Sequence, residues 1–147
     1  MLLFIINLAF AGDYEFLGRW HTLPDVTVCP NSNVDIDDVE NAVDYWKTRG
    51  HDFGDIYEKS RCDSKYPDGV IQFNDPKNEV DTSRSFGHSQ VQEYNHVITS
   101  VSIQISEEGS RNYEVVVHEL GHALGIYHVD DKTDIMYIYH AYVMTYF

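Results

Sequence analysis

The sequence has little positive charge, few prolines and only two cysteines. Its 10 Lys and Arg residues stand against 24 Asp and Glu residues, which gives a formal net charge of −14. Such a surface repels nucleic acids and anionic membranes, so nucleic-acid binding is not expected. The chain also lacks internal repeats and tracts rich in Pro, Gly or Ser, which excludes collagenous and low-complexity proteins. With 147 residues, 43% of them hydrophobic, it is long enough for one folded domain with its own core.

The first eleven residues, MLLFIINLAFA, carry no charged side chain. A helix that spans a bilayer takes about 20 apolar residues, so this stretch is too short and no membrane span is expected. It ends in Ala9-Phe10-Ala11, an A-x-A pattern typical of a secretory cleavage site. We therefore expect residues 1–11 to be a signal peptide of a secreted or periplasmic protein, and residues 12–147 to be the mature domain. The alternatives are a buried first strand and a mis-assigned start.

Cys29 and Cys62 are the two cysteines, which is the minimum for a disulfide. In an exported protein they would most simply pair with each other. The alternative is two separate buried thiols. A third interpretation, in which Cys62 blocks a metal as a latency switch, has less support because Cys62 lies inside the domain.

Three segments have the apolar composition of β-strands, and they are Phe16 to Cys29, Gly69 to Phe73 and residues 97–105. Residues 97–105 alternate cleanly, with apolar side chains at one set of positions and Ser100, Ser102 and Gln104 among the others. This alternation predicts a strand with one buried face.

Two segments have helical periodicity. From Asn33 to Arg49 apolar residues recur at three- and four-residue steps, with Asn33 or Asp35 as the N-cap and Gly50 at the exit. A second helix begins near Ser110 or Asn112. The order of strand, helix, strands and helix predicts an α/β (α+β) fold, in which two helices pack on one sheet.

The second helix contains a pattern typical of a metal site, His118-Glu119-Leu120-Gly121-His122. His118 and His122 are four residues apart, so both imidazoles project from one helical face and can reach a single Zn²⁺. Glu119 lies beside the open position of the metal, where its carboxylate can accept a proton from a bound water.

Gly125 and His128 extend this pattern. Three residues after His122, Gly125 can adopt a positive φ and turn the chain out of the helix. The turn would bring His128 back as a third ligand. Three nitrogen ligands leave the fourth position to water, which indicates a catalytic zinc site and not a structural one.

The complete run, H-E-x-x-H-x-x-G-x-x-H, resembles the signature of the metzincin zinc endopeptidases, whose second mark is a downstream methionine turn. Asp134-Ile135-Met136-Tyr137 matches that turn, and its Met-Tyr pair is most similar to the matrixins, the matrix metalloproteinase family. Upstream, Gly69 to Phe73, Phe86 to Ser89 and Val97 to Ile105 are similar, in order, to strands of the matrixin catalytic domain.

The resemblance implies a metzincin-like zincin fold, with one twisted mixed sheet, a backing helix, an active-site helix and a short C-terminal part containing the Met-turn. It also implies that His118, His122 and His128 bind one catalytic Zn²⁺ and that Glu119 is the general base. Met136 would form an apolar floor beneath the metal.

The activity implied is hydrolysis of internal peptide bonds by a zinc-bound water. The substrate would be an extended polypeptide paired with the edge strand at Phe86 to Ser89, and Tyr137 would wall the pocket for the residue after the scissile bond. The protein is expected to act as a monomer. The alternatives are a non-catalytic zinc-dependent binding module on the same fold, and a metzincin of another family such as the astacins.

Several features depart from the matrixin pattern. No cysteine-switch prosegment precedes the domain in this sequence, and the usual C-terminal helix is not expected after Met136. A structural Zn²⁺ has candidate ligands in His88 and His96 but no His-x-Asp partner, and no loop has convincing Ca²⁺ ligand spacing. Three acidic residues follow the third histidine, Asp130, Asp131 and Asp134. They either support the metal ligands or form a solvated loop.

Overall fold

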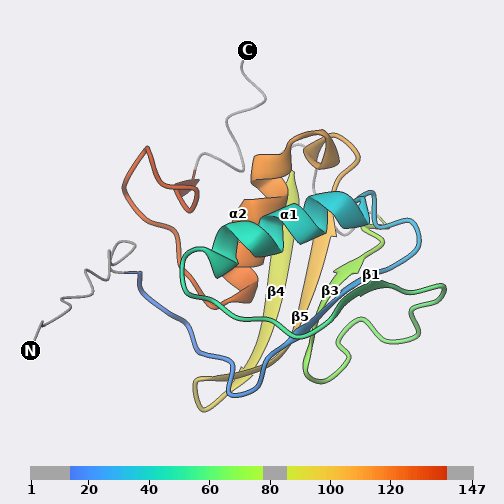
Figure 1. Cartoon of the computed structure of the whole chain (residues 1–147), viewed down its shortest axis with the longest axis horizontal. Coiled ribbons are helices and arrows are strands. Elements are labelled where there is room, and N and C mark those ends of the chain that lie inside the picture. The colour runs from blue at the N-terminus through green and yellow to red at the C-terminus, as the bar shows by residue number, and fades with distance from the viewer. Residues whose placement is uncertain (1–13, 78–85, 139–147) are drawn as a thin grey trace, which may run out of the picture.

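One five-stranded sheet with both helices on the same face forms the frame of the domain (Figure 1). The computed structural model describes residues 14–77 and 86–138. Along the chain the elements are β1 (Asp25–Val28), α1 (Ile36–Lys47), β2 (Ile56–Glu58), β3 (Val70–Asn74), β4 (Gly87–Tyr94), β5 (Val97–Ile105), the short 3-10 helix η1 (Gly109–Arg111) and α2 (Tyr113–Ala123). The α/β class and the pair of helices agree with the sequence prediction.

The strands lie in the order β2-β1-β3-β5-β4. Neighbours among the first four are parallel, and β4 runs antiparallel to β5 at the edge. The sheet is therefore mixed, as expected. The crossover from β1 to β2 contains α1, and the connection from β3 to its parallel neighbour β5 contains the antiparallel strand β4.

Helix α1 is the backing helix. Asp35 lies at its N-cap position, and Trp46 in its last turn is completely buried. The indole Nε1 of Trp46 donates a hydrogen bond to the backbone oxygen of Val117 in α2, at 2.9 Å. A buried indole N–H needs an acceptor, so this bond fixes the two helices against each other as well as satisfying the donor.

The first predicted strand is shorter than expected. Of Phe16 to Cys29, residues Asp25–Val28 form β1, while Phe16 and Arg19 make single bridges to Ile126 and Val97. Pro24 directly precedes the strand and has no N–H for a ladder bond, which limits the pairing on its N-terminal side.

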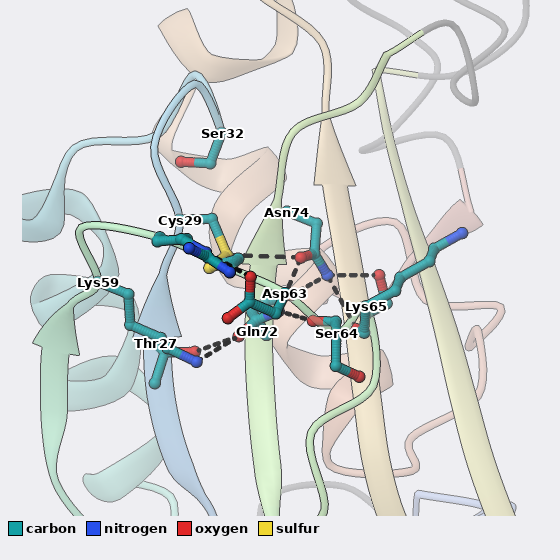
Figure 2. Close-up of a disulfide and its surroundings, with 12 residues drawn as sticks. Thr27, Cys29, Ser32, Lys59, Asp63, Ser64, Lys65, Gln72 and Asn74 are labelled. Atoms are coloured by element: carbon teal, nitrogen blue, oxygen red, sulfur yellow. Dashed lines mark hydrogen bonds and ion pairs between the residues drawn. A yellow bond between two sulfur atoms is a disulfide. The ribbon is translucent and has the colours of Figure 1, made fainter.

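The prediction of one buried face for residues 97–105 is wrong. Ser100, Ser102 and Gln104 are also buried, with at most 5% of their surface exposed. The loop between β2 and β3 crosses this polar face, and its backbone oxygens accept hydrogen bonds from the sheet. Gln72 Nε2 donates to Ser64 O at 2.7 Å and Asn74 Nδ2 donates to Lys65 O at 3.1 Å (Figure 2).

A disulfide between Cys29 and Cys62 ties that loop to the end of β1 (Figure 2). The pairing expected for the two cysteines is thus present, and the alternative of two separate thiols is wrong. Because the loop covers buried polar side chains, the disulfide also keeps their hydrogen-bond partners in place.

Residues 1–11 lie outside the described residues, as do positions 139–147 beyond the Met-turn. The expectations of a signal peptide and of no C-terminal helix fall there. Within the described parts of the chain, no helix is long and apolar enough to cross a membrane.

We predict that replacing both cysteines, as Cys29→Ser/Cys62→Ser, lowers the free energy of unfolding by about 3–4 kcal/mol. The disulfide closes a loop of 33 residues, and the cross-link restricts the unfolded chain. Urea denaturation of the double variant and of the oxidised wild type measures the difference. Equal free energies of unfolding would contradict the prediction.

Candidate metal centre

Helix α2 carries the first two histidines on one face. Its first turn is capped by Asn112, whose side-chain oxygen accepts a hydrogen bond from the N–H of Glu114 at 3.0 Å. One turn separates His118 from His122, and their ring centroids are 4.8 Å apart. The helix therefore presents two imidazoles to the same point, as the spacing predicts.

Gly125 turns the chain toward the third histidine. Its φ is +90°, in the region that glycine adopts without strain. A Cβ at this position would also collide with the backbone oxygen of Gly18. The turn after α2 therefore needs a glycine for two reasons, and it brings His128 back over the end of the helix.

The three imidazoles converge through their Nε2 atoms. His128 Nε2 lies 3.1 Å from His118 Nε2 and 3.0 Å from His122 Nε2. Nitrogens bound to one tetrahedral Zn²⁺ at about 2.0–2.1 Å would be about 3.3 Å apart, so the observed separations are close to those of a zinc site. Among the described residues, these three histidines form the one group of three or more side chains able to hold a metal.

Hydrogen bonds at the far side of two rings set the tautomer. His118 Nδ1 lies 2.7 Å from the backbone oxygen of Ile135, and His122 Nδ1 lies 2.8 Å from that of Ile126. A carbonyl oxygen only accepts, so each Nδ1 carries the proton and each Nε2 directs a lone pair at the shared centre. This is the arrangement that metal-binding histidines need.

Desolvation favours the neutral form of His122 and of His128. Desolvation is the main cause that lowers the pKa of His122, to about 4, while the hydrogen bond to the oxygen of Ile126 acts in the opposite direction. A positive charge on His128 or His88 would lower this pKa further. His128 is exposed as a residue, but partial desolvation of its ring also lowers its pKa. A neutral imidazole is the form that binds a metal, so at physiological pH no proton has to be displaced from His122.

The Met-turn packs against the histidine cluster. Asp134 Oδ1 accepts a hydrogen bond from the N–H of Met136 at 2.8 Å, and this fold of the turn presents the oxygen of Ile135 to His118. Met136 is completely buried, and its Sδ packs on Gly121 so closely that a Cβ there would collide with it. Met136 therefore packs against the helix between the first two histidines, and its role as an apolar floor beneath the metal stays a prediction.

The first described residues of the chain hold the loop that carries His128. Leu17 N donates to Gly125 O at 2.7 Å, and Tyr127 N donates to Glu15 O at 3.0 Å. Tyr14 adds a side-chain hydrogen bond of 2.8 Å to Asp134 Oδ2. Residues 14–17 thus anchor both the third histidine and the Met-turn, although they are more than 100 positions away in sequence.

Glu119 is buried next to the histidine cluster, with 3% of its surface exposed. Burial raises the pKa of its carboxyl to about 7, while a hydrogen bond from Ser89 acts in the opposite direction. A carboxyl with a pKa near neutral can both accept and return a proton at physiological pH. The histidines and Glu119 line a cavity of about 370 Å³ whose other wall is strand β4.

Comparison with known proteins agrees with this geometry. The matrixin family model matches residues 10–146. The chain belongs to the matrixin family. Searches of curated proteins and of solved structures find no match. Membership indicates a metallopeptidase of the zinc-dependent kind and agrees with the metzincin-like sheet and helices described above.

Other predicted residues of this matrixin lie outside the histidine cluster. Tyr137 is half-buried in the Met-turn and is not part of the cavity lining, so its role in substrate binding stays a prediction. His88 is the second residue of β4 and His96 lies beyond the last one, so the two are too far apart along the strand to share an ion. Of the three acidic residues after His128, Asp134 supports the Met-turn and Asp130 is exposed. Asp131 accepts a hydrogen bond from the N–H of Thr133.

The structure adds residues that the sequence analysis did not identify as part of the site. Ser89 bonds to Glu119, Gly87 leaves room for its carboxylate, and Gly121 leaves room for Met136. Tyr14 reaches Asp134 from the other end of the chain. Ser89 and Gly87 lie two residues apart on a predicted edge strand and so share one face of it. This shared face was the sequence feature that could have placed both residues at the site.

We predict that the protein binds one Zn²⁺ per chain and that His128→Ala weakens the affinity by more than about a hundredfold, because a direct ligand should cost more than its supporting groups. Competition with a chromogenic chelator measures the affinity. His21→Ala, at an exposed histidine outside the cluster, is the matched control and should bind as the wild type does. Equal binding by the His128 variant would exclude this residue as a ligand.

We also predict a pH-dependent difference in stability between the metal-free wild type and Glu119→Gln. The folded-state pKa of Glu119, about 7, exceeds its ordinary value of 4.5. Its contribution to the free energy of unfolding is therefore complete below pH 4.5 and is lost as the pH rises through 7. Relative to the variant, the wild type should lose about 3 kcal/mol over this interval. Urea denaturation with a chelator tests this, and a difference that does not change with pH would contradict it.

Proposed function

We propose that this matrixin is a zinc-dependent endopeptidase that hydrolyses internal peptide bonds of extended polypeptides. The observation that carries the proposal is the convergence of three imidazoles beside the buried carboxyl of Glu119 in one open cavity. Three nitrogen ligands leave a coordination position open, which is the layout of catalytic zinc sites.

The ion would lower the pKa of a water to about 7 and polarise the substrate carbonyl. The residues of the chain would bind the ion and transfer the proton. His118, His122 and His128 would hold the ion, with His118 and His122 oriented by their bonds to backbone oxygens. Glu119, as the general base, would accept the proton of the attacking water and then donate it to the leaving amine.

The position of the edge strand β4 supports the proposal of an extended substrate. β4 is the last strand of the sheet and pairs with β5 on one side. Its residues also line the cavity, so a peptide added along the outer edge of β4 would pass the histidine cluster. Backbone hydrogen bonds would then hold the substrate in line with Glu119.

We further propose that residues 1–11 direct export, that residues 12–147 form the catalytic domain, and that the domain acts as a monomer outside the cytosol. The disulfide supports this location, because disulfides persist in oxidising compartments. The A-x-A pattern at Ala9 to Ala11 is the sequence feature behind the export proposal.

We predict that the full chain cleaves an unfolded protein substrate at neutral pH and that Glu119→Gln lowers kcat/KM by about 10²- to 10⁴-fold, the usual contribution of a general base. A chelator should abolish cleavage and added Zn²⁺ should restore it. Glu114→Gln is the matched control, because it removes a carboxylate from the exposed first turn of the same helix. This control should keep the wild-type rate.

Two results would contradict the proposal in different ways. A folded, zinc-loaded wild type with no cleavage would favour the non-catalytic binding module. Cleavage that Glu119→Gln leaves intact would show that another group is the base.

A further inference from the structure

The Ser89 hydroxyl lies within hydrogen-bond distance of two oxygens of Glu119. Ser89 Oγ lies 2.7 Å from Oε2 of the Glu119 carboxyl and 2.9 Å from the backbone oxygen of the same residue. Both distances are those of good hydrogen bonds. Ser89 thus connects the edge strand β4 directly to the candidate base on α2.

Gly87 fixes the other side of the carboxyl. It lies two residues before Ser89, on the same face of β4. A Cβ on Gly87 would be 2.7 Å from Cγ and 2.9 Å from Oε1 of Glu119, which is too close for two non-bonded atoms. The carboxyl therefore fits directly against the backbone of β4 at Gly87 while Ser89 holds its other oxygen.

The strand that carries these two residues is itself well anchored at this point. Ser89 is paired with Ile103 of β5 and Gly87 with Ile105, and both isoleucines are at most 1% exposed. The Ser89 hydroxyl is therefore presented to Glu119 by a rigid part of the sheet and not by a loop.

We propose that Ser89 is a positioning residue that holds the Glu119 carboxyl in one orientation throughout the proton transfers of the reaction. The proposal rests on the proposed function, in which Glu119 is the general base. It concerns the rate of the chemical step and does not make Ser89 a metal ligand or a nucleophile.

The two acceptors explain how one hydroxyl can serve both states of the carboxyl. While Glu119 is a carboxylate, the single proton on Ser89 Oγ is donated to Oε2. Once Glu119 has accepted a proton on Oε2, this new O–H can donate to Ser89 Oγ, and the serine proton turns to the backbone oxygen of Glu119. No proton is gained or lost by Ser89, and the carboxyl keeps a partner in both states.

We therefore expect Ser89→Ala to lower kcat by about ten- to a hundredfold, the range that follows from losing a hydrogen bond to a charged group. KM for a peptide substrate and the zinc content should stay at their wild-type values. Ser89→Thr, which keeps the hydroxyl on the strand, should recover most of kcat. Steady-state kinetics, metal analysis and thermal unfolding of the full-length variants measure these quantities.

Ser110→Ala is the matched control, since this serine also donates to a backbone oxygen, that of Glu107, but away from the cavity. It should keep the wild-type kcat. In the Glu119→Gln background, Ser89→Ala should cause no further loss, because the group that it positions is no longer a base.

Each other outcome has a definite meaning. A wild-type kcat for Ser89→Ala, or an equal loss in Ser89→Thr, would overturn the positioning role while the proposed function stands. Loss of zinc or of folding in Ser89→Ala would also overturn it, because the serine would then be structural. Full activity of Glu119→Gln would instead refute the part of the proposed function in which Glu119 is the general base.

Discussion

Gly121 has no side chain, and Met136 and Trp46 occupy the space that a side chain would take. This contact determines how closely the Met-turn and helix α1 approach the helix that carries two of the histidines. Because Ile135 is next to Met136, the same approach brings its backbone oxygen within hydrogen-bond distance of His118. One small residue between His118 and His122 thus sets the position of the helix and the tautomer of a ligand at once.

The site combines groups in very different surroundings. His118 and Glu119 are buried, His122 is partly covered, and His128 is exposed on the loop after α2. Burial has opposite effects on the two kinds of group, since it lowers the pKa of His122 and raises that of Glu119. In both cases the neutral form is favoured. The imidazole of His122 can therefore bind a cation without losing a proton, and the carboxyl of Glu119 can both accept and return a proton near neutral pH.

Local sequence predicted those parts of the site that depend on local geometry. The four-residue spacing of His118 and His122 predicts a shared helical face, and Gly125 predicts the turn that returns His128. The partners of Glu119 could not be predicted in the same way, because Ser89 meets it only through the pairing of β4 with β5. For the same reason, sequence alternation predicted one buried face for β5 and did not show that a disulfide-bound loop covers the other.

The dependence of the His128 loop on residues 14–17 has a consequence for the order of assembly. These residues leave the ribosome before the rest of the described chain, but the carbonyl and amide groups to which they bond, at Gly125 and Tyr127, are made more than 100 residues later. Residues 14–17 therefore cannot make these hydrogen bonds until Gly125 and Tyr127 have been synthesised. Contacts of such long sequence separation slow folding. A nascent chain would complete its sheet early and its third imidazole late. The candidate metal centre would thus form after most of the described fold that surrounds it.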